Sequence, residues 1–470
     1  MGICAVRVRA TVLHCIVPTG VRGLGAAVAA WVVMSSVAFA AEPDDLTRWG
    51  IIHPSIASSL PDHGDPAGIR RWLAERGVTY SLIYINDMLA NTRGGIRRGA
   101  ADQGKLEGIL RIDLDKLAGL QGLSFYSSFF QIHGSEGIRR DYVGGINTVS
   151  NIEALPTTRL SELWIEQKFA SGAGSIRAGQ LALDAEFAIS EVSSIFLQSG
   201  WPTMAAVNLP SGGPAYPFAT PGVRLKFDPT EEISALMAVT NGDPAGPGEG
   251  DEQLRNRHGL DFRVRDPALI FGELQFRRNQ GERDTGLAGA LKLGGWVHLG
   301  RFDDRRFASD GRLLADPASS GEPAQRKGNS GVYAVADQQL YRPKGGGPES
   351  GVSVFGRASF SPSDRNLVDV AFDGGIVFAG MIPGRPRDRF GASVTYARFS
   401  DSVRDFDRDT VAFTGVPGPI RDYETNLELT YVAQIVRGWY VQPNVQFIWH
   451  PDGDSSRNAT VVGARSILRY

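Results

Sequence analysis

Nine polar or aromatic side chains could contact a small polar solute, because each takes the hydrophilic side of an alternating segment. Successive side chains of an extended strand point to opposite faces, so residues two apart share a face. Leu163 and Ile165, for example, alternate with Trp164 and Glu166. Such a face offers hydrogen-bond donors, acceptors and an aromatic ring. The nine residues are Arg111, Trp164, Glu166, Lys168, Arg177, Arg224, Lys226, Arg263 and Arg357.

Residue types that support catalysis are present without the spacing that catalysis needs. The histidines after residue 40 form no HExxH motif and no triad spacing, and the glycine-rich runs lack the Lys-Ser/Thr pair of a phosphate-binding loop. The acidic pairs at 303–304 and 452–454 could bind calcium, but solvated turn carboxylates are far more common. We therefore expect no enzyme, no catalytic residue, no metal site and no cofactor.

The N-terminus has the pattern of a secretory signal peptide. Three arginines within the first 22 residues precede an apolar run over 24–39, which ends in Ala38-Phe39-Ala40, a small-x-small cleavage signature. The alternative is an N-terminal membrane anchor. We expect a signal peptide over 1–40, and the rest of the sequence has no run of 18 apolar residues that would predict a helical span.

Cysteine usage and charge exclude several classes of protein. Cys4 and Cys15 are the only cysteines, and both lie in the predicted signal peptide, so the mature chain offers no disulfide, thiol nucleophile or cysteine metal ligand. Removing three arginines leaves 46 basic against 51 acidic residues. This balance gives no basic surface of the kind that binds nucleic acid.

Beyond residue 77 the chain alternates between apolar and polar residues, which predicts an all-β fold. The clearest strands are expected at 78–89, 108–114, 426–436, 439–449 and 458–470. Such strands could form a soluble sandwich or a transmembrane antiparallel β-barrel. Arginine dominates the polar face, often beside an acid, which favours a water-filled barrel interior. Long polar loops expected at 241–256, 303–329 and 342–350 alternate with short turns such as 437–438, as in outer-membrane barrels.

Two features stand outside the strand pattern. Residues 41–77 are not strand-like, and Asp65-Pro66 predicts the start of a short helix in which Ile69, Trp72 and Leu73 share a packing face. Pro443 lies within an alternating segment although it lacks an N–H, so we expect a bulge or a strand end near Gln442. The predicted organisation is a signal peptide at 1–40, an N-terminal segment at 41–77 and a barrel domain at 78–470.

Several segments, taken in order, resemble the carbohydrate-selective (OprB-type) porins of Gram-negative outer membranes. They cover most of the mature chain, and their order is more specific than any one of them. The segments are GIRRWLAERGVTYSLIYINDMLANTRGG (68–95), RLSELWIEQKFASGAGSIRAGQLALDAEF (159–187), GPAYPFATPGVRLKF (213–227), LGGWVHLGRFDD (293–304), GNSGVYAVADQQLY (328–341), FAGMIPGRPRDRFGASVTYA (378–397) and the ribbon NLELTYVAQIVRGWYVQPNVQFIWHP (426–451).

The resemblance implies a barrel of about sixteen antiparallel strands, with a short helical N-terminal segment on the periplasmic side and a lumen narrowed by inward loops. It also implies passive diffusion of glucose-like monosaccharides or small oligosaccharides across the cell outer membrane. The alternatives are a general diffusion porin and a non-conducting envelope barrel that serves adhesion or anchoring. Sugar preference and oligomeric state stay open.

The resemblance also implies partners and a role for the nine polar residues. Small sugars would be the permeants, outer-membrane lipid would surround the barrel, and the assembly machinery would recognise the C-terminal strand, which ends in the aromatic Tyr470. In a sugar pore the nine side chains would exchange hydrogen bonds with hydroxyls, and Trp164 would offer a ring face. The alternative is that each one belongs to a structural charge ladder of the wall, with Trp164 packed beneath an inward loop.

Overall fold

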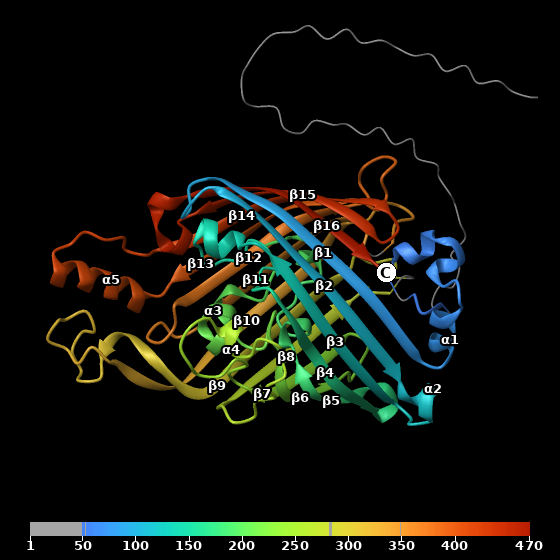
Figure 1. Cartoon of the computed structure of the whole chain (residues 1–470), viewed down its shortest axis with the longest axis horizontal. Helices are drawn as coiled ribbons and strands as arrows, with labels where there is room; N and C mark the ends of the chain where they lie inside the picture. Colours follow the sequence, from blue (N-terminus) through green and yellow to red (C-terminus); the bar gives the residue numbers. More distant parts are fainter. Residues whose placement is uncertain (1–48, 52, 282–283, 348) are drawn as a thin grey trace, which may run out of the picture. The chain divides into compact units, whose positions relative to one another are not determined.

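Sixteen antiparallel strands close into a barrel in the part of the chain that the structure describes (Figure 1). The structure is a computed structural model, and it describes residues 49–51, 53–281, 284–347 and 349–470. The predicted signal peptide at 1–40 and the first residues of the 41–77 segment lie outside this range. Each strand pairs with its neighbours in sequence, and β1 pairs with β16 to complete the ring. The predicted fold class is confirmed.

The predicted strands at 78–89, 426–436, 439–449 and 458–470 agree with observed strands to within a few residues, whereas the strand predicted at 108–114 begins nine residues earlier, at Gly99. The strands are β1 (Val78–Arg93), β2 (Gly99–Asp113), β3 (Leu123–Gly134), β4 (Thr157–Phe169), β5 (Gly174–Leu181), β6 (Thr220–Phe227), β7 (Ile233–Asn241), β8 (Ala268–Arg278), β9 (Gly289–Ala308), β10 (Pro323–Tyr341), β11 (Gly351–Phe360), β12 (Val368–Ala379), β13 (Arg389–Phe399), β14 (Tyr423–Val436), β15 (Trp439–Trp449) and β16 (Ala459–Arg469).

Short helices occupy the connections and the segment before β1. They are η2 (Ile56–Ser59), η3 (Pro61–Gly64), α1 (Ile69–Glu75), α2 (Leu114–Ala118), η4 (Ile138–Val143), η5 (Ala170–Gly172), η6 (Leu183–Ala185), η7 (Val192–Ile195), α3 (Thr203–Asn208), η8 (Pro210–Gly212), α4 (Glu252–Arg255), α5 (Asp401–Thr414), η9 (Pro451–Gly453) and η10 (Ser455–Arg457). Within the described ranges, no helix is long and apolar enough to cross a membrane.

The wall has an apolar outer face and a polar inner face. Val223 and Leu225 on β6 are 40% and 46% exposed on the outside, whereas Arg224 between them points inward and is buried. The same alternation places Leu274 outside and Glu273 inside on β8. A closed ring leaves no unpaired strand edge, and its outward apolar band is compatible with a lipid bilayer.

The two ends of the barrel differ in the length of their connections. One end carries short connections such as 437–438 and 380–388, together with α1 and α2, and is called the short-turn end here (Figure 1). The other, the long-loop end, carries the connections 135–156, 182–219, 242–267 and 400–422. The predicted loop at 342–350 joins β10 to β11 and lies at the short-turn end, so the predicted alternation of long loops and short turns is wrong at this point.

The loop predicted at 303–329 is also wrong at both of its ends. β9 extends to Ala308 and β10 begins at Pro323, so only 309–322 connects them, and the extended hairpin stands out at the long-loop end (Figure 1). Arg306 on β9 forms ion pairs with Asp405 (2.6 Å) and Asp409 (2.8 Å) of α5. This part of the hairpin is polar because its neighbours are charged rather than apolar. A polar composition of this kind predicts a loop.

Helix α1 packs through an arginine instead of the predicted apolar face. Arg70 is buried, and its guanidinium carbon lies 5.2 Å from the Tyr80 ring centroid and 4.9 Å from that of Tyr470. Ile69 and Trp72 are more than half exposed. Tyr80, near the start of β1, and Tyr470, at the C-terminus, therefore hold α1 against the short-turn end by cation–π contacts.

Pro443 lies inside β15 on the outer face, without the predicted bulge or strand end. Pairing with β14 lapses between Thr430–Asn444 and Ala433–Val441, but the register on the two sides is the same. On the other side Pro443 pairs in unbroken register with Ala464 of β16. The missing N–H thus removes local pairing with one neighbour, while the second neighbour keeps the strand in place.

A buried ion pair joins the first and last strands. Asp87 on β1 and Arg465 on β16 form two contacts of 2.6 and 2.7 Å, and the side chains are 0% and 6% exposed. Ser150 donates to Asp87 at 2.7 Å, and Arg465 donates to Asn151 at 2.8 Å. The closing seam of the barrel is therefore tied to a connection from the long-loop end.

Replacing Asp87 by alanine should destabilise the folded barrel by about 3–5 kcal/mol, because it leaves the Arg465 guanidinium buried without its counter-charge. Heat-modifiable migration in gels measures this as a lower unfolding temperature. Arg71→Ala, which removes a half-exposed pair with Glu75 on α1, is the control and should cost less than about 1 kcal/mol. Equal unfolding temperatures for Asp87→Ala and the wild type would contradict the role of this pair.

Candidate functional site

Two connections from the long-loop end fold into the barrel and cover much of its inner wall. The larger inner loop (182–219) places Phe187, Trp201 and other apolar side chains against inward residues of β7–β10 such as Phe271 and Trp296. The smaller inner loop (135–156) packs Tyr142 and its neighbours against inward residues of β1, β2, β15 and β16. These clusters exclude water from the covered wall.

Buried carboxylates of β14 hold the backbone of both inner loops. Glu428 accepts hydrogen bonds from the backbone N–H groups of Leu197 and Gln198, both at 2.8 Å. Glu424 accepts from the N–H groups of Ile146 and Asn147, also at 2.8 Å. Backbone donors inside the barrel need such acceptors, and ionised acceptors make the stronger bonds. These hydrogen bonds therefore fix the position of each inner loop along the barrel axis.

Arg357, one of the nine predicted side chains, is a further anchor of the larger inner loop. It pairs with Asp373 at 2.7 Å and donates to the carbonyls of Ala188 (2.8 Å) and Gly200 (3.1 Å). On the same part of the wall, Glu273 accepts from the N–H of Ala188 at 2.7 Å. Arg357 is on the expected inner face, but loop packing leaves it 5% exposed.

The inner wall of β2–β5 holds a stack of cations and aromatic rings. The Tyr126 and Trp164 rings lie 4.7 Å apart at an interplanar angle of 11°. The guanidinium of Arg111 lies 5.2 Å from the Tyr126 centroid, and that of Arg177 lies 3.8 Å from the Trp164 centroid. In the strand register Arg111 faces Tyr126, and Tyr126 faces Trp164, so adjacent strands build the stack.

A glycine opposite Trp164 makes room for this arrangement. Gly179 on β5 pairs with Trp164 and has φ +143°, a conformation that side chains rarely adopt. A Cβ atom at this position would lie 2.2 Å from the carbonyl oxygen of Leu163. The absence of a side chain therefore allows β5 to approach β4 closely beneath the indole ring.

Glu166 connects the stack to the larger inner loop. Its carboxylate accepts from Arg177 at 3.3 Å and from Arg224 at 2.8 Å. Arg224 also binds Glu186 of the larger inner loop at 2.8 Å and is only 1% exposed. Arg224 therefore lies on the expected face but serves as a buried bridge, whereas Arg177 stays partly exposed beside it.

The remaining three predicted side chains lie apart from the stack. Lys168 is exposed near the end of β4, and Lys226 pairs with Asp228 at 3.0 Å near the end of β6. The strand expected around Arg263 is wrong, because 261–265 form an irregular part of the β7–β8 connection. Arg263 pairs there with Asp266 at 2.6 Å. No neighbouring strand pairs with this short alternating segment, so the segment does not become part of the barrel wall.

Sequence reasoning missed four residues that extend the polar wall. Lys105 and Glu107 form a 3.0 Å ion pair on β2, and Lys105 lies 5.2 Å from the ring centroid of Tyr216 in the larger inner loop. Lys105 and Glu107 have the same parity as Arg111, so extending that strand upstream would have found them. Tyr126 follows the alternation of β3, but no periodic signal marks Tyr216.

The polar wall of β2–β5 presents hydrogen-bond donors and acceptors. Glu107 precedes Arg111 by four residues on one strand, a span of about 13 Å. The Lys105–Glu107 pair, the stack and Glu166 therefore offer donors and acceptors at successive heights along the wall. Exchange between many weak sites lets a solute move on instead of staying bound.

The apolar exterior, the closed ring of sixteen strands and the inward loops define an outer-membrane porin in the described part of the chain. The family model described as "Carbohydrate-selective porin, OprB family" matches residues 97–469. The chain belongs to this family of carbohydrate-selective porins, and its function is the facilitated passive diffusion of carbohydrates across the outer membrane.

Individual relatives agree with the family match. Porin B of Pseudomonas aeruginosa is 24% identical over 426 residues, which cover 86% of this chain and 89% of the relative. The high-pH structure of Pseudomonas putida OprB is similar in fold, with a TM-score of 0.78 at 22% identity over 86% of this chain and 97% of that one. The low-pH structure of the same protein gives a TM-score of 0.53 at 18% identity, over 87% and 97%.

Replacing Glu428 by alanine should loosen the larger inner loop, because two buried N–H groups lose their carboxyl acceptor. A hydrogen bond contributes about 0.5–1.5 kcal/mol net, so losing two should raise the population with the loop open about tenfold or more. Limited proteolysis within 182–219 measures this population. Glu252→Ala, at an exposed position of α4, is the control, and an unchanged cleavage rate in Glu428→Ala would disprove the anchoring role.

Proposed function

We propose that glucose-like monosaccharides and small oligosaccharides cross the barrel along the wall of β2–β5, guided by the cation–aromatic stack. The observation that supports this route is the distribution of the inner loops. Their apolar clusters lie against β7–β16, β1 and part of β2. The larger inner loop reaches β2–β6 through polar and aromatic side chains instead, such as Glu186 and Tyr216. Arg111, Trp164 and Arg177 lie on this polar side, which a hydrated solute needs.

The stack suggests how a sugar would be recognised. Tyr126 and Trp164 cover each other on one face, and a guanidinium group lies over the outer face of each ring. A pyranose ring therefore meets the guanidinium groups and the ring edges, not a free aromatic face. A planar guanidinium can donate two parallel hydrogen bonds, which suits two adjacent hydroxyl oxygens. In this proposal the aromatic rings orient the arginines that bind the sugar.

The other parts of the chain have roles that follow from the same proposal. Residues 1–40 direct export and are cleaved, 41–77 lie on the periplasmic side, and 78–470 form the barrel in contact with outer-membrane lipid. The C-terminal strand is the part that the assembly machinery recognises. Permeation is the whole activity, with no chemical step and no cofactor. Arg224 supports the route by bridging Glu166 and Glu186. Lys168 adds positive charge at the short-turn end, where Lys226 is paired with Asp228.

Replacing Trp164 by alanine should weaken sugar binding, because Arg177 loses the ring that orients it. Aromatic pairs contribute about 0.5–1.5 kcal/mol, so the glucose concentration that halves the ion current should rise about three- to tenfold. Titration of glucose against single channels in planar bilayers measures this. Arg263→Ala is the matched control, because Arg263 lies in the β7–β8 connection away from the stack and should leave the titration unchanged.

The same recordings separate the alternatives. A wild-type current that no sugar reduces would identify a general diffusion porin. No current from folded, heat-modifiable protein would identify a non-conducting barrel. Equal glucose titrations for wild type and Trp164→Ala would retain a sugar porin but reject the stack as its binding site.

A further inference from the structure

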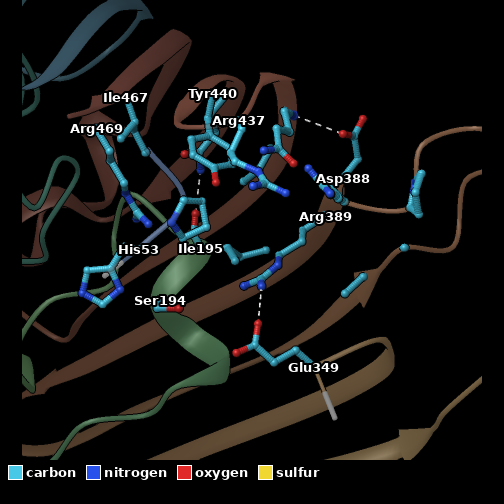
Figure 2. A pocket seen from close by; sticks show the side chains of 18 of the residues that line it. His53, Ser194, Ile195, Glu349, Asp388, Arg389, Arg437, Tyr440, Ile467 and Arg469 are labelled. Carbon is cyan, nitrogen blue, oxygen red and sulfur yellow. Dashed lines mark hydrogen bonds and ion pairs between the residues drawn. The ribbon is translucent and has the colours of Figure 1, made fainter. Parts of the chain in front are cut away.

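A cavity of about 900 Å³ lies inside the short-turn end and is lined by residues other than those of the cation–aromatic stack (Figure 2). Its walls come from the ends of β12–β16, the 342–350 and 380–388 connections, and Ser194–Ile195 at η7 of the larger inner loop. His53 and Pro54, from the segment before η2, close another side. This volume is within the range of small-molecule sites, about 300–1,000 Å³.

Positive charge dominates the lining of this cavity. Five arginines line it, against the two acidic residues Glu349 and Asp388. Both acids are already engaged, Glu349 by Arg389 and Asp388 by Arg385 at 2.7 Å. Figure 2 shows the Arg389–Glu349 pair on one side of the cavity and Arg437 and Arg469 on others.

Three of the lining arginines have no carboxylate within ion-pair distance in the part of the chain that is described. These are Arg387, Arg437 and Arg469. The Nε atom of Arg469 is buried without a hydrogen-bond partner among the described residues, although its guanidinium carbon lies 5.6 Å from the Tyr440 ring centroid. A buried donor without an acceptor is costly, so a bound acceptor at this position would be favourable.

The pKa of His53 responds to the same positive charges. Burial, together with the positive charges of Arg111 and Arg469, lowers the pKa of His53 below its ordinary value. A lowered pKa favours the neutral imidazole, so the uncompensated charge of the cavity comes from its arginines.

We propose that this cavity is a binding site for a monosaccharide-sized organic anion, namely a sugar that carries a carboxylate. Guanidinium groups bind carboxylates through two parallel hydrogen bonds, and the partly enclosed position strengthens the attraction relative to open water. The pore would then hold an acidic sugar at its short-turn end after the polar wall of β2–β5 has admitted it. This inference rests on the proposed conduction of sugars.

The experiment compares glucuronate with glucose as blockers of single-channel current in planar bilayers, each added to both compartments. In the double variant Arg437→Gln/Arg469→Gln, the half-blocking concentration of glucuronate should rise at least about fivefold, while that of glucose stays within about twofold. Raising the salt from about 0.1 to 1 M should weaken glucuronate block in the wild type far more than glucose block. Arg265→Gln, 71% exposed in the β7–β8 connection, is the control and should change neither.

An unchanged glucuronate titration in the double variant would overturn the proposal, as would an equal loss for glucose and glucuronate. The single variant Arg437→Gln, at a two-residue turn, gives the same test if the double variant does not fold, with a smaller expected rise. Failure of glucose to block the wild type would reject the proposed function, whereas the difference between glucuronate titrations would still decide whether the cavity binds anions.

Discussion

Hydrogen bonding of backbone groups inside a closed barrel is the constraint on which the rest of this structure depends. The strands satisfy their own N–H and C=O groups by closing the ring, but two connections that enter the lumen bring further backbone groups away from water. Glu424 and Glu428 accept from these loops, and Arg357 donates to them. Many charged side chains of the inner wall therefore serve to hold the inner loops.

The division of the lumen follows from this support. Where wall side chains hold the loops, the interior is packed and apolar, as around Phe271 and Trp296. On β2–β5 the wall instead holds Arg111, Trp164 and Arg177 against one another. The same residue types thus serve as anchors on one side and as a candidate binding surface on the other. What distinguishes the two sides is whether the loop residues that contact the wall are apolar or polar.

The sequence predicts the fold and one part of the site well, because both follow from a period of two. Alternation identified the strand at Trp164 and Glu166, and the inner face follows from which side is polar. Alternation does not predict which residues cover that face. Arg224 and Arg357 therefore have the same sequence pattern as Arg177, although the first two are buried. The cover comes from residues 182–219, which have no repeating pattern. Tyr216 lies in this segment, so no periodic pattern predicts its role.

The remaining errors have equally physical causes. Five alternating residues around Arg263 are too few to specify a strand when no neighbouring strand pairs with them. The hairpin of β9 and β10 beyond the wall lacks an apolar face, so its Asp- and Arg-rich sequence resembles a loop. Pro443 argues against regular pairing with both neighbours, but pairing with β16 alone keeps its register.

The most direct test of this account of the wall is the accessibility of single cysteines introduced after residue 40, where the natural sequence contains none. Arg177→Cys would place a thiol on the polar wall of β2–β5, and Ala238→Cys would place one beneath the larger inner loop. The account predicts rapid modification at position 177 by a water-soluble thiol reagent, slowed by glucose, and slow modification at position 238. Equal rates at the two positions, unaffected by glucose, would contradict it.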